Sequence, residues 1–262
     1  MRITLVQNDI IWEHKEANLL FYESIFSGLS GKTDLVVLPE MCTTGFTMKS
    51  ESLAEYDDES TITSLIRMAE SYDFAIAGSF IGKGNREDNS DNIFNRGFFV
   101  HPDGKVDFYN KRHLFRMGEE PEHYSPGNTI NIIEYRGWKI RLSICYDLRF
   151  PVWNRNVDNN YDLLLVTANW PQARDHVWTS LLTARAIENM IYVCGVNRIG
   201  SDGMKITYSG SSMLVNAYGT TISGMTPFME QVETYEINLD ELKRFREKFP
   251  VWKDADRFEI YD

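Results

Sequence analysis

Residues 139–149 have the sequence KIRLSICYDLR, in which a strand-like run ends before Cys145 and a polar segment follows. Two further strand-like runs consist almost entirely of apolar residues: LVVL at 35–38 and LLLVT at 163–167. Runs that are apolar throughout are typical of strands buried on both faces of a sheet. Glu40 and Asn169 follow these two runs as Cys145 follows the first. Ligands bind at the carboxyl ends of strands in α/β folds, so the pattern predicts that these three residues lie at such a site.

Helical and strand-like segments alternate along the rest of the chain. Apolar residues recur at helical spacing in four segments: about 14–29, 62–69, 177–187 and 238–248. Further strand-like runs lie at 3–7, 74–78, 98–101 and 192–196, and turns are expected at 102–105 and 216–219. No linker rich in Pro, Gly or Ser divides the chain. We therefore expect an α/β fold with a mixed sheet, in one domain over 1–262 that ends in an extended segment from about 245.

The composition argues against several classes of protein. The chain has 262 residues, 27 Lys and Arg against 38 Asp and Glu, and a formal net charge of −11. Without a basic excess, binding to nucleic acid is not expected. The longest apolar runs are far below the ~20 residues of a membrane span, so no membrane partner is expected either. The N-terminal RITLV at 2–6 lacks the pattern of a signal peptide.

Three cysteines, Cys42, Cys145 and Cys194, form no C-x-x-C pair. An odd and sparse set of this kind predicts free thiols in a reducing compartment, so we expect a cytoplasmic protein without structural zinc. Free cysteine is often simply buried in the core, which is the expectation for Cys194 within its apolar run. Cys145, at a strand end, has the position of a catalytic nucleophile, and both interpretations of it stay open at this point.

A catalytic thiol needs a base to take its proton. Histidine is the usual one, and three of the five histidines are well placed for this role: His113, His123 and His176. Glu40 is the alternative base, because a carboxylate that ends a buried strand is rarely buried without a partner. Lys111 opens the segment KRHLFR at 111–116, which a solvated basic loop would also explain.

Three motifs together resemble the signatures of the carbon–nitrogen hydrolase, or nitrilase, superfamily. They are LPE at 38–40, YNKRHL at 109–114 and SICYDLRFP at 143–151, in that family's order and spacing. The bacterial omega-amidase branch is more similar still, through FRMGEE at 115–120, ANWP at 168–171 and the tail at 245–256. The resemblance covers essentially the whole chain. It implies a four-layer α-β-β-α sandwich that pairs into homodimers.

The resemblance also implies a Glu–Lys–Cys triad. Carried over to this sequence, Cys145 is the nucleophile, Glu40 the general base and acid, and Lys111 the electrostatic partner. A second family glutamate precedes a Pro-Gly turn, and Glu120 fits it best, seven residues before Gly127. Two neighbours stay open for that assignment: Glu119 and Glu122. The implied chemistry requires no metal and no organic cofactor.

Omega-amidases of this branch hydrolyse short dicarboxylic acid monoamides, such as alpha-ketoglutaramate, alpha-ketosuccinamate and succinamate, to the acid and ammonia through a cysteine thioester. A small amide of this kind is therefore the expected partner. Its distal carboxylate needs a cation, for which the candidates are Arg116 and Arg149. Other substrate contacts are expected from the backbone N–H of Tyr146, which would stabilise the oxyanion, and from Asn169 and Trp170.

Two alternatives to an omega-amidase stay open from the sequence. Other branches use the same triad for nitriles, N-carbamyl compounds or aliphatic amides, so the chain could be another amidase or an N-carbamyl hydrolase. A catalytically inactive binding protein on the same fold is the non-enzyme alternative. The presence of Glu40, Lys111 and Cys145 argues against it.

Overall fold

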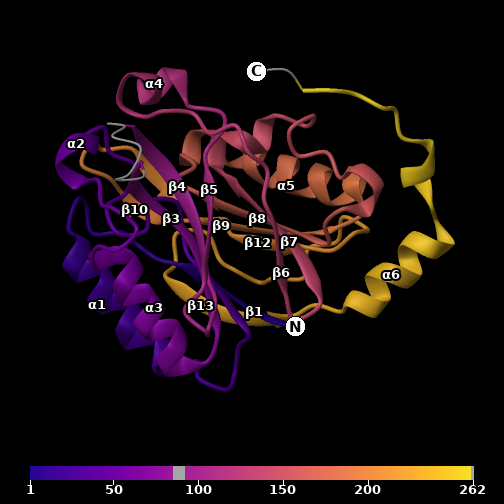
Figure 1. Cartoon of the computed structure of the whole chain (residues 1–262), viewed down its shortest axis with the longest axis horizontal. Coiled ribbons are helices and arrows are strands. Elements are labelled where there is room, and N and C mark those ends of the chain that lie inside the picture. The colour runs from indigo at the N-terminus through magenta and orange to yellow at the C-terminus, as the bar shows by residue number, and fades with distance from the viewer. Residues whose placement is uncertain (85–91, 261–262) are drawn as a thin grey trace.

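Two β-sheets pack face to face in the computed structural model, which describes residues 1–84 and 92–260 (Figure 1). The strands of the first sheet are β1 Arg2–Gln7, β2 Leu35–Val37, β3 Ala75–Lys83, β4 Ile93–Val100, β5 Val106–Asn110 and β13 Gln231–Glu236. Those of the second are β6 Ile132–Tyr135, β7 Trp138–Ile144, β8 Leu163–Ala168, β9 Tyr192–Asn197 and β12 Met213–Val215. A short hairpin joins β10 Ile199–Ser201 to β11 Thr207–Ser209.

Both sheets are mixed, as predicted. The first has the order β13-β1-β2-β3-β4-β5, and the second has the order β12-β9-β8-β7-β6. Three central strands run parallel in each sheet, β1 to β3 in the first and β7 to β9 in the second. The strands outside them are antiparallel to their neighbours. The parallel strands therefore present their carboxyl ends at a common edge of each sheet.

Helices cover the outer face of each sheet and complete the predicted four-layer sandwich. The covering helices are α1 Lys15–Phe26 and α3 Ser60–Tyr72 on the first sheet and α5 Asp175–Asn189 on the second. Further helices lie at the margins of the sheets: α2 Ser50–Leu53, α4 Glu120–His123 and α6 Leu239–Lys248. Figure 1 shows α1 and α3 on the side of the first sheet and α5 on the side of the second. In β2, Leu35 and Val37 pack between the sheets whereas Val36 packs beneath the helices. This burial on both faces explains why the strand is apolar throughout.

The predicted helices and strands are confirmed, with shifts at their ends. The turns at 102–105 and 216–219 also form, and Gly104 and Gly219 adopt the positive φ that such turns require. Six strands of the described chain were missed because they are short or carry mostly polar residues: β5, β6, β10, β11, β12 and β13. In β13, for example, QVETYE is an edge strand that is only half buried, so it lacks a long apolar run. The strand β4 begins five residues before the expected start, in a segment that includes buried Asn95 and Arg96.

The C-terminal segment leaves the body of the protein after α6, which ends at Lys248 as the predicted helix at 238–248 does (Figure 1). A short 3-10 turn follows at Val251–Asp254, and residues 255–260 are exposed and without regular structure. The helix itself is held by Arg246, which donates to Oδ1 of Asp162 at 2.6 Å and to the carbonyls of Met190 and Tyr161. This contact joins α6 to the second sheet.

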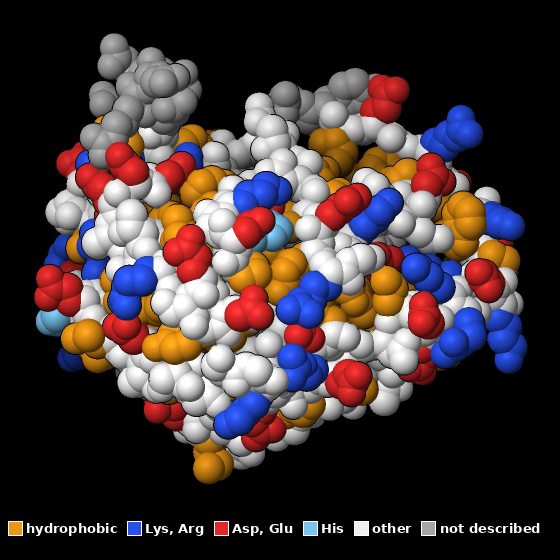
Figure 2. Space-filling model, turned by 60° about the horizontal axis from the view of Figure 1, so that its bottom comes forward, with side chains coloured by type: hydrophobic (Ala, Val, Ile, Leu, Met, Phe, Trp, Pro, Cys, Tyr) orange, Lys and Arg blue, Asp and Glu red, His pale blue; other side chains and the backbone are white. Residues whose placement is uncertain are grey.

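The surface carries both signs of charge. On the face drawn in Figure 2, Lys and Arg side chains are interspersed with Asp and Glu side chains. Some of them pair, as Arg67 does with Glu23 at 2.7 Å. The net charge of −11 is therefore not concentrated in one patch on this face. Within residues 1–84 and 92–260, no helix has both the length and the apolar character needed to cross a membrane.

We predict that Arg246→Met lowers the free energy of unfolding by about 3 kcal/mol, because it leaves the Asp162 carboxylate buried without its cation. Chemical denaturation monitored by circular dichroism measures this change. Arg244→Met is the matched control, since Arg244 lies exposed on the same helix and its loss should cost less than about 0.5 kcal/mol. Equal effects of the two substitutions would contradict the role of the buried ion pair.

Candidate active site

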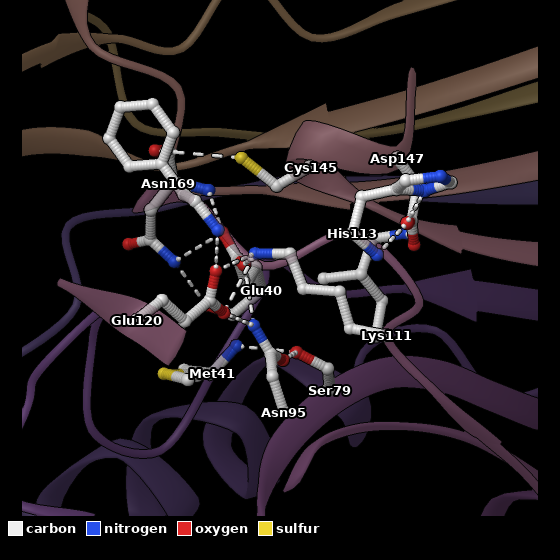
Figure 3. Close-up of polar contacts among 12 residues, drawn as sticks. Glu40, Met41, Ser79, Asn95, Lys111, His113, Glu120, Cys145, Asp147 and Asn169 are labelled. Carbon is white, nitrogen blue, oxygen red and sulfur yellow. Dashed lines mark hydrogen bonds and ion pairs between the residues drawn. The ribbon is translucent and has the colours of Figure 1, made fainter. Parts of the chain in front are cut away.

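The candidate site lies where the carboxyl ends of β2, β7 and β8 meet (Figure 3). Glu40 follows β2 in the first sheet, whereas Cys145 and Asn169 directly follow β7 and β8 in the second. Asn169 connects the two sheets. Its backbone N–H donates to Oε2 of Glu40 at 2.8 Å, and its side-chain Nδ2 donates to the Glu40 carbonyl at 2.6 Å. The structure thus brings together the three residues that the strand pattern singled out.

Lys111 lies at the centre of the site between two carboxylates. Its Nζ donates to Oε1 of Glu40 at 2.9 Å and to both oxygens of Glu120 at 2.9 and 3.0 Å. All three side chains are almost completely buried. The third side of the ammonium faces the ring of Phe46, at 5.2 Å from the ring centroid. Lys111 is therefore part of a buried ionic cluster and not of the solvated loop that its sequence context also allowed.

Burial and charge act against each other in this cluster. Burial alone would lower the pKa of Lys111, but the negative charges of Glu120 and Glu40 outweigh it and raise that pKa above its ordinary value. Lys111 is therefore a stable ammonium. Burial raises the pKa of Glu120; Lys111 opposes this shift, and the neighbouring Glu40 carboxylate adds to it.

The geometry distinguishes among the three candidate second glutamates. Glu120 is buried and contacts Lys111, whereas Glu119 and Glu122 are exposed. The backbone N–H of Phe115 also donates to Oε2 of Glu120, at 2.5 Å. Gly127 closes this loop against β5, where a Cβ would come within 2.2 Å of the Asn110 carbonyl oxygen. A glycine is required for this close approach, which keeps the loop that carries Glu120 over Lys111.

Cys145 occupies a strained turn at the start of a 3-10 segment, Cys145–Arg149, with a φ of +45°. Its Sγ lies 3.9 Å from the carbonyl oxygen of Asn169 and faces the cavity. Burial and the Glu40 charge hold the pKa of the Cys145 thiol well above its usual range, and Lys111 offsets only part of this effect. The resting sulfur is a neutral thiol, so it needs a base to become a nucleophile.

Asp147 holds this turn in place. Its Oδ2 accepts the Ile144 N–H at 3.1 Å and the Tyr109 hydroxyl at 2.8 Å, while its Oδ1 accepts the backbone N–H and Nδ1 of His113, both at 2.8 Å. The His113 ring also stacks on Phe150 with centroids 3.6 Å apart. Figure 3 shows His113 directed at Asp147, away from the Cys145 sulfur. His113 is thus positioned as a structural partner of Asp147 and not as the base of a Cys–His pair.

A cavity of about 330 Å³ opens above Cys145. Glu40, Lys111 and Cys145 form its polar floor, and its walls include Tyr146 and Trp170, which the sequence predicted as substrate contacts. Further aromatic side chains line it: Phe46, Phe115 and Tyr208. No histidine lines this cavity. The described residues contain no group of three or more His, Cys, Asp or Glu side chains arranged to hold a metal ion.

Two arginines line the cavity, and one of them was not expected. Arg149 lies over Trp170 with its Cζ 5.0 Å from the ring centroid, and Arg174 lies over Phe115 at 5.4 Å. Neither forms an ion pair within residues 1–84 and 92–260. Arg116, the other candidate for a distal carboxylate, is exposed and does not line the cavity. The structure therefore replaces Arg116 by Arg174 as the second cation of the site.

Sequence reasoning missed Arg174 and Asn95. Arg174 belongs to a 3-10 turn, Gln172–Arg174, directly after the ANWP motif, and nothing in its local pattern indicates which way the side chain points. Asn95 donates from Nδ2 to Glu40 at 2.7 Å and to Glu120 at 3.2 Å. Its signal was available, because a polar pair interrupts the otherwise apolar strand β4.

Comparison with known proteins shows that the chain belongs to the carbon–nitrogen hydrolase family, which matches residues 2–247. Omega-amidase YafV of Escherichia coli K12 is 44% identical over 263 residues, covering 100% of this chain and 99% of that protein. The 2-oxoglutaramate amidase of Bacillus subtilis is 31% identical over 265 residues, with 99% and 98% covered. The predicted membership of the nitrilase superfamily, and with it a hydrolase of carbon–nitrogen bonds, is confirmed.

Solved structures agree with the fold. A superfamily member from Xanthomonas campestris, described with an arsenic adduct in its active site, superposes with a TM-score of 0.95 at 37% identity, covering 100% of this chain and 99% of that one. Yeast Nit3, described as a member of branch 10 of the nitrilase superfamily, superposes with a TM-score of 0.84 at 23% identity, with 96% and 94% covered. The predicted α-β-β-α sandwich is therefore confirmed.

We predict that Cys145→Ala abolishes amide hydrolysis, measured as ammonia release, and removes inactivation by iodoacetamide. The reason is that only Cys145 among the three cysteines lines the cavity, whereas Cys42 and Cys194 are buried in the core. Cys194→Ala is the matched control and should retain activity, apart from a loss of stability. Turnover by Cys145→Ala near the wild-type rate would contradict the assignment of the nucleophile.

Proposed function

We propose that this protein is an omega-amidase, which hydrolyses short dicarboxylic acid monoamides such as alpha-ketoglutaramate, alpha-ketosuccinamate and succinamate to the acid and ammonia. One observation carries the proposal: a buried Glu–Lys–Glu cluster lies beside a cavity-facing thiol, below a wall with two arginines that have no carboxylate partner among residues 1–84 and 92–260. The names of the relatives, omega-amidase and 2-oxoglutaramate amidase, support it.

In the first step, the Cys145 sulfur attacks the amide carbonyl carbon while Glu40 takes the thiol proton. The base is needed because the thiol is neutral at rest. The carbonyl oxygen becomes an oxyanion, for which Lys111 supplies a fixed positive charge and Tyr146 a backbone N–H. A single donor to such an oxyanion commonly contributes about 10²–10³ in kcat.

In the second step, the carbon–nitrogen bond breaks and Glu40 returns the proton to the leaving nitrogen, so that ammonia departs and a thioester stays on Cys145. Water then takes the place of ammonia and loses a proton to Glu40 as its oxygen attacks the thioester carbon. When the carbon–sulfur bond breaks, Glu40 protonates the sulfur and the acid leaves. The proton balance closes on Glu40, and Glu120 keeps Lys111 in place throughout.

The distal carboxylate of the substrate is the natural partner for the arginines on the cavity wall. Arg149 and Arg174 are held by stacking on Trp170 and Phe115 and are otherwise without an anionic partner in the described chain. A guanidinium binds a carboxylate through two parallel hydrogen bonds, which fixes both position and orientation. The carboxylate at one end would thus hold the amide at the other end over Cys145, with Asn169 and Trp170 beside it.

We also propose that the enzyme works as a homodimer in the cytoplasm. The three free thiols suit a reducing compartment. Two exposed apolar side chains lie beside each other, Val152 of the loop after the nucleophile turn and Phe258 of the tail. Val152 and Phe258 line one groove together with Glu188. A second copy of the chain would remove these surfaces from water.

We predict that ammonia is released from alpha-ketoglutaramate and succinamate at a kcat/KM at least tenfold above that for butyramide, which lacks the distal carboxylate. Arg149→Met or Arg174→Met should reduce this preference by about ten- to a hundredfold, since each removes a charge-assisted hydrogen bond. Arg116→Met is the matched control and should leave the preference unchanged. A tenfold preference for butyramide, a nitrile or an N-carbamyl amino acid would refute the omega-amidase assignment.

We expect light scattering at micromolar concentration to give twice the mass of one chain. Val152→Asp should shift the protein towards the monomer, because it places a charge on the proposed contact surface. Leu20→Asp tests whether any exposed apolar residue would do so; Leu20 is 65% exposed on α1, in the opposite outer layer. A monomer mass for the unmodified protein would argue against the dimer.

A further inference from the structure

We infer that Asn95 is a positioning residue that holds the two catalytic glutamates in place on Lys111 and favours their ionised forms. This inference rests on the proposed function in one respect only, namely that Glu40 serves as the base for Cys145. The family resemblance assigned roles to Glu40, Lys111, Cys145 and Glu120, and gave none to Asn95.

Asn95 contacts three of the four predicted catalytic residues. From β4, its Nδ2 donates to Oε1 of Glu40 at 2.7 Å and to Oε1 of Glu120 at 3.2 Å. Its backbone carbonyl accepts the N–H of Lys111 at 3.0 Å. The side chain is completely buried, so no water can replace these bonds from the bulk solvent. A shift of Asn95 would therefore disturb both carboxylates and the ammonium between them.

The orientation of the Asn95 amide is determined by a chain of hydrogen bonds (Figure 3). The backbone N–H of Met41 can only donate, and it donates to Oγ of Ser79 at 2.8 Å. The Ser79 hydroxyl in turn donates a hydrogen bond to Oδ1 of Asn95 at 3.0 Å. The amide oxygen is thus directed at Ser79, which leaves the NH₂ group for the carboxylates. The reverse orientation would place an oxygen against two carboxylate oxygens, which is strongly unfavourable.

This chain closes on itself, because Met41 is the residue after Glu40. It runs from the backbone beside Glu40 through Ser79 and Asn95 and back to the Glu40 carboxylate. Met41 also has a positive φ of 44°, a conformation that an ordinary side chain adopts only when its surroundings hold it there. The loop therefore fixes the Glu40 carboxylate relative to its own backbone, at the point where proton transfer needs accurate placement.

An amide NH₂ can donate to a carboxylate but cannot accept from a carboxylic acid, so Asn95 stabilises only the ionised form of each glutamate. It acts in the same direction as Lys111 and against burial. The other ionisable groups around the two carboxylates are Cys145, Tyr124 and Tyr208. None of the three carries a positive charge. Loss of the Asn95 donors should therefore remove a stabilisation that only the ionised carboxylates receive, and favour proton uptake by the buried cluster.

The test is Asn95→Leu, which retains the branched shape and removes both donors. The measurement is the rate of iodoacetamide reaction with Cys145 as a function of pH, and in parallel the pH profile of kcat/KM. We expect the acidic limb of both profiles to move up by about one pH unit, and the rate at the original midpoint to fall about tenfold or more. Ser79→Ala should move the limb in the same direction by less, because it frees the amide to rotate but keeps its donors.

Asn156→Leu is the matched control. Asn156 is also buried, and its side-chain amide forms hydrogen bonds with the backbones of Tyr161 and Asn189 and none with Glu40 or Glu120 among the described residues. It should lose stability without moving the limb. The inference would be overturned if Asn95→Leu and Ser79→Ala slowed the reaction but left the acidic limb of both pH profiles at its wild-type position. If Asn95→Leu does not fold, Ser79→Ala decides the matter by itself.

Alkylation of Cys145 requires no amide substrate, so the two proposals fail separately. A wild-type enzyme that releases no ammonia from dicarboxylic monoamides would refute the omega-amidase assignment and leave the alkylation shift intact. An absent shift with normal ammonia release would refute the role of Asn95 alone. Glu40→Gln serves as the reference, since it should remove the acidic limb altogether.

Discussion

The structure depends on one buried cation. Lys111 carries its ammonium into a region with almost no access to water, and Glu40 and Glu120 accept its three hydrogen bonds. Removing Lys111 would leave two buried carboxylates without their cation, which is far more costly than losing a surface pair. The arrangement requires both sheets. Glu40 and Lys111 follow strands β2 and β5 of the first sheet, whereas Asn169, whose backbone N–H binds the Glu40 carboxylate, follows β8 of the second.

The turn that carries Cys145 is held by contacts other than those of the Glu40–Lys111–Glu120 cluster. Asp147 accepts hydrogen bonds from Ile144, Tyr109 and His113, and so ties the turn that carries Cys145 to the segment that carries Lys111. The positive φ of Cys145 is sustained by this buried carboxylate. One anion therefore sets the distance between the thiol and the ammonium, although Asp147 does not line the cavity itself.

The sequence patterns predicted the strands in which nearly every side chain is buried. Strands β2 and β8 are apolar or nearly so because both of their faces are covered, whereas β7 is apolar at alternate positions, on the face between the sheets. The residues that follow these strands include Glu40, Cys145 and Asn169. Asn95 was missed because it is a polar residue inside strand β4. The apolar pattern that predicts a strand is interrupted at this position, where the site needs a hydrogen-bond donor. Arg174 was missed for a different reason: a turn residue acquires its direction only from tertiary packing, here on Phe115.

The charged groups of the cavity differ between its floor and its wall. The floor holds the Glu40 carboxylate, the Lys111 ammonium and a neutral thiol, and the Glu120 carboxylate lies buried behind Lys111, whereas Arg149 and Arg174 make the wall positive. A molecule with a carboxylate at one end and an uncharged amide at the other has only one favourable orientation in such a field, with the amide inward. Binding in the reverse sense would place the carboxylate against Glu40 and Glu120. The acidic floor therefore contributes to selectivity by exclusion, while the arginines contribute by attraction, and an overall charge of −11 does not prevent the binding of an anion.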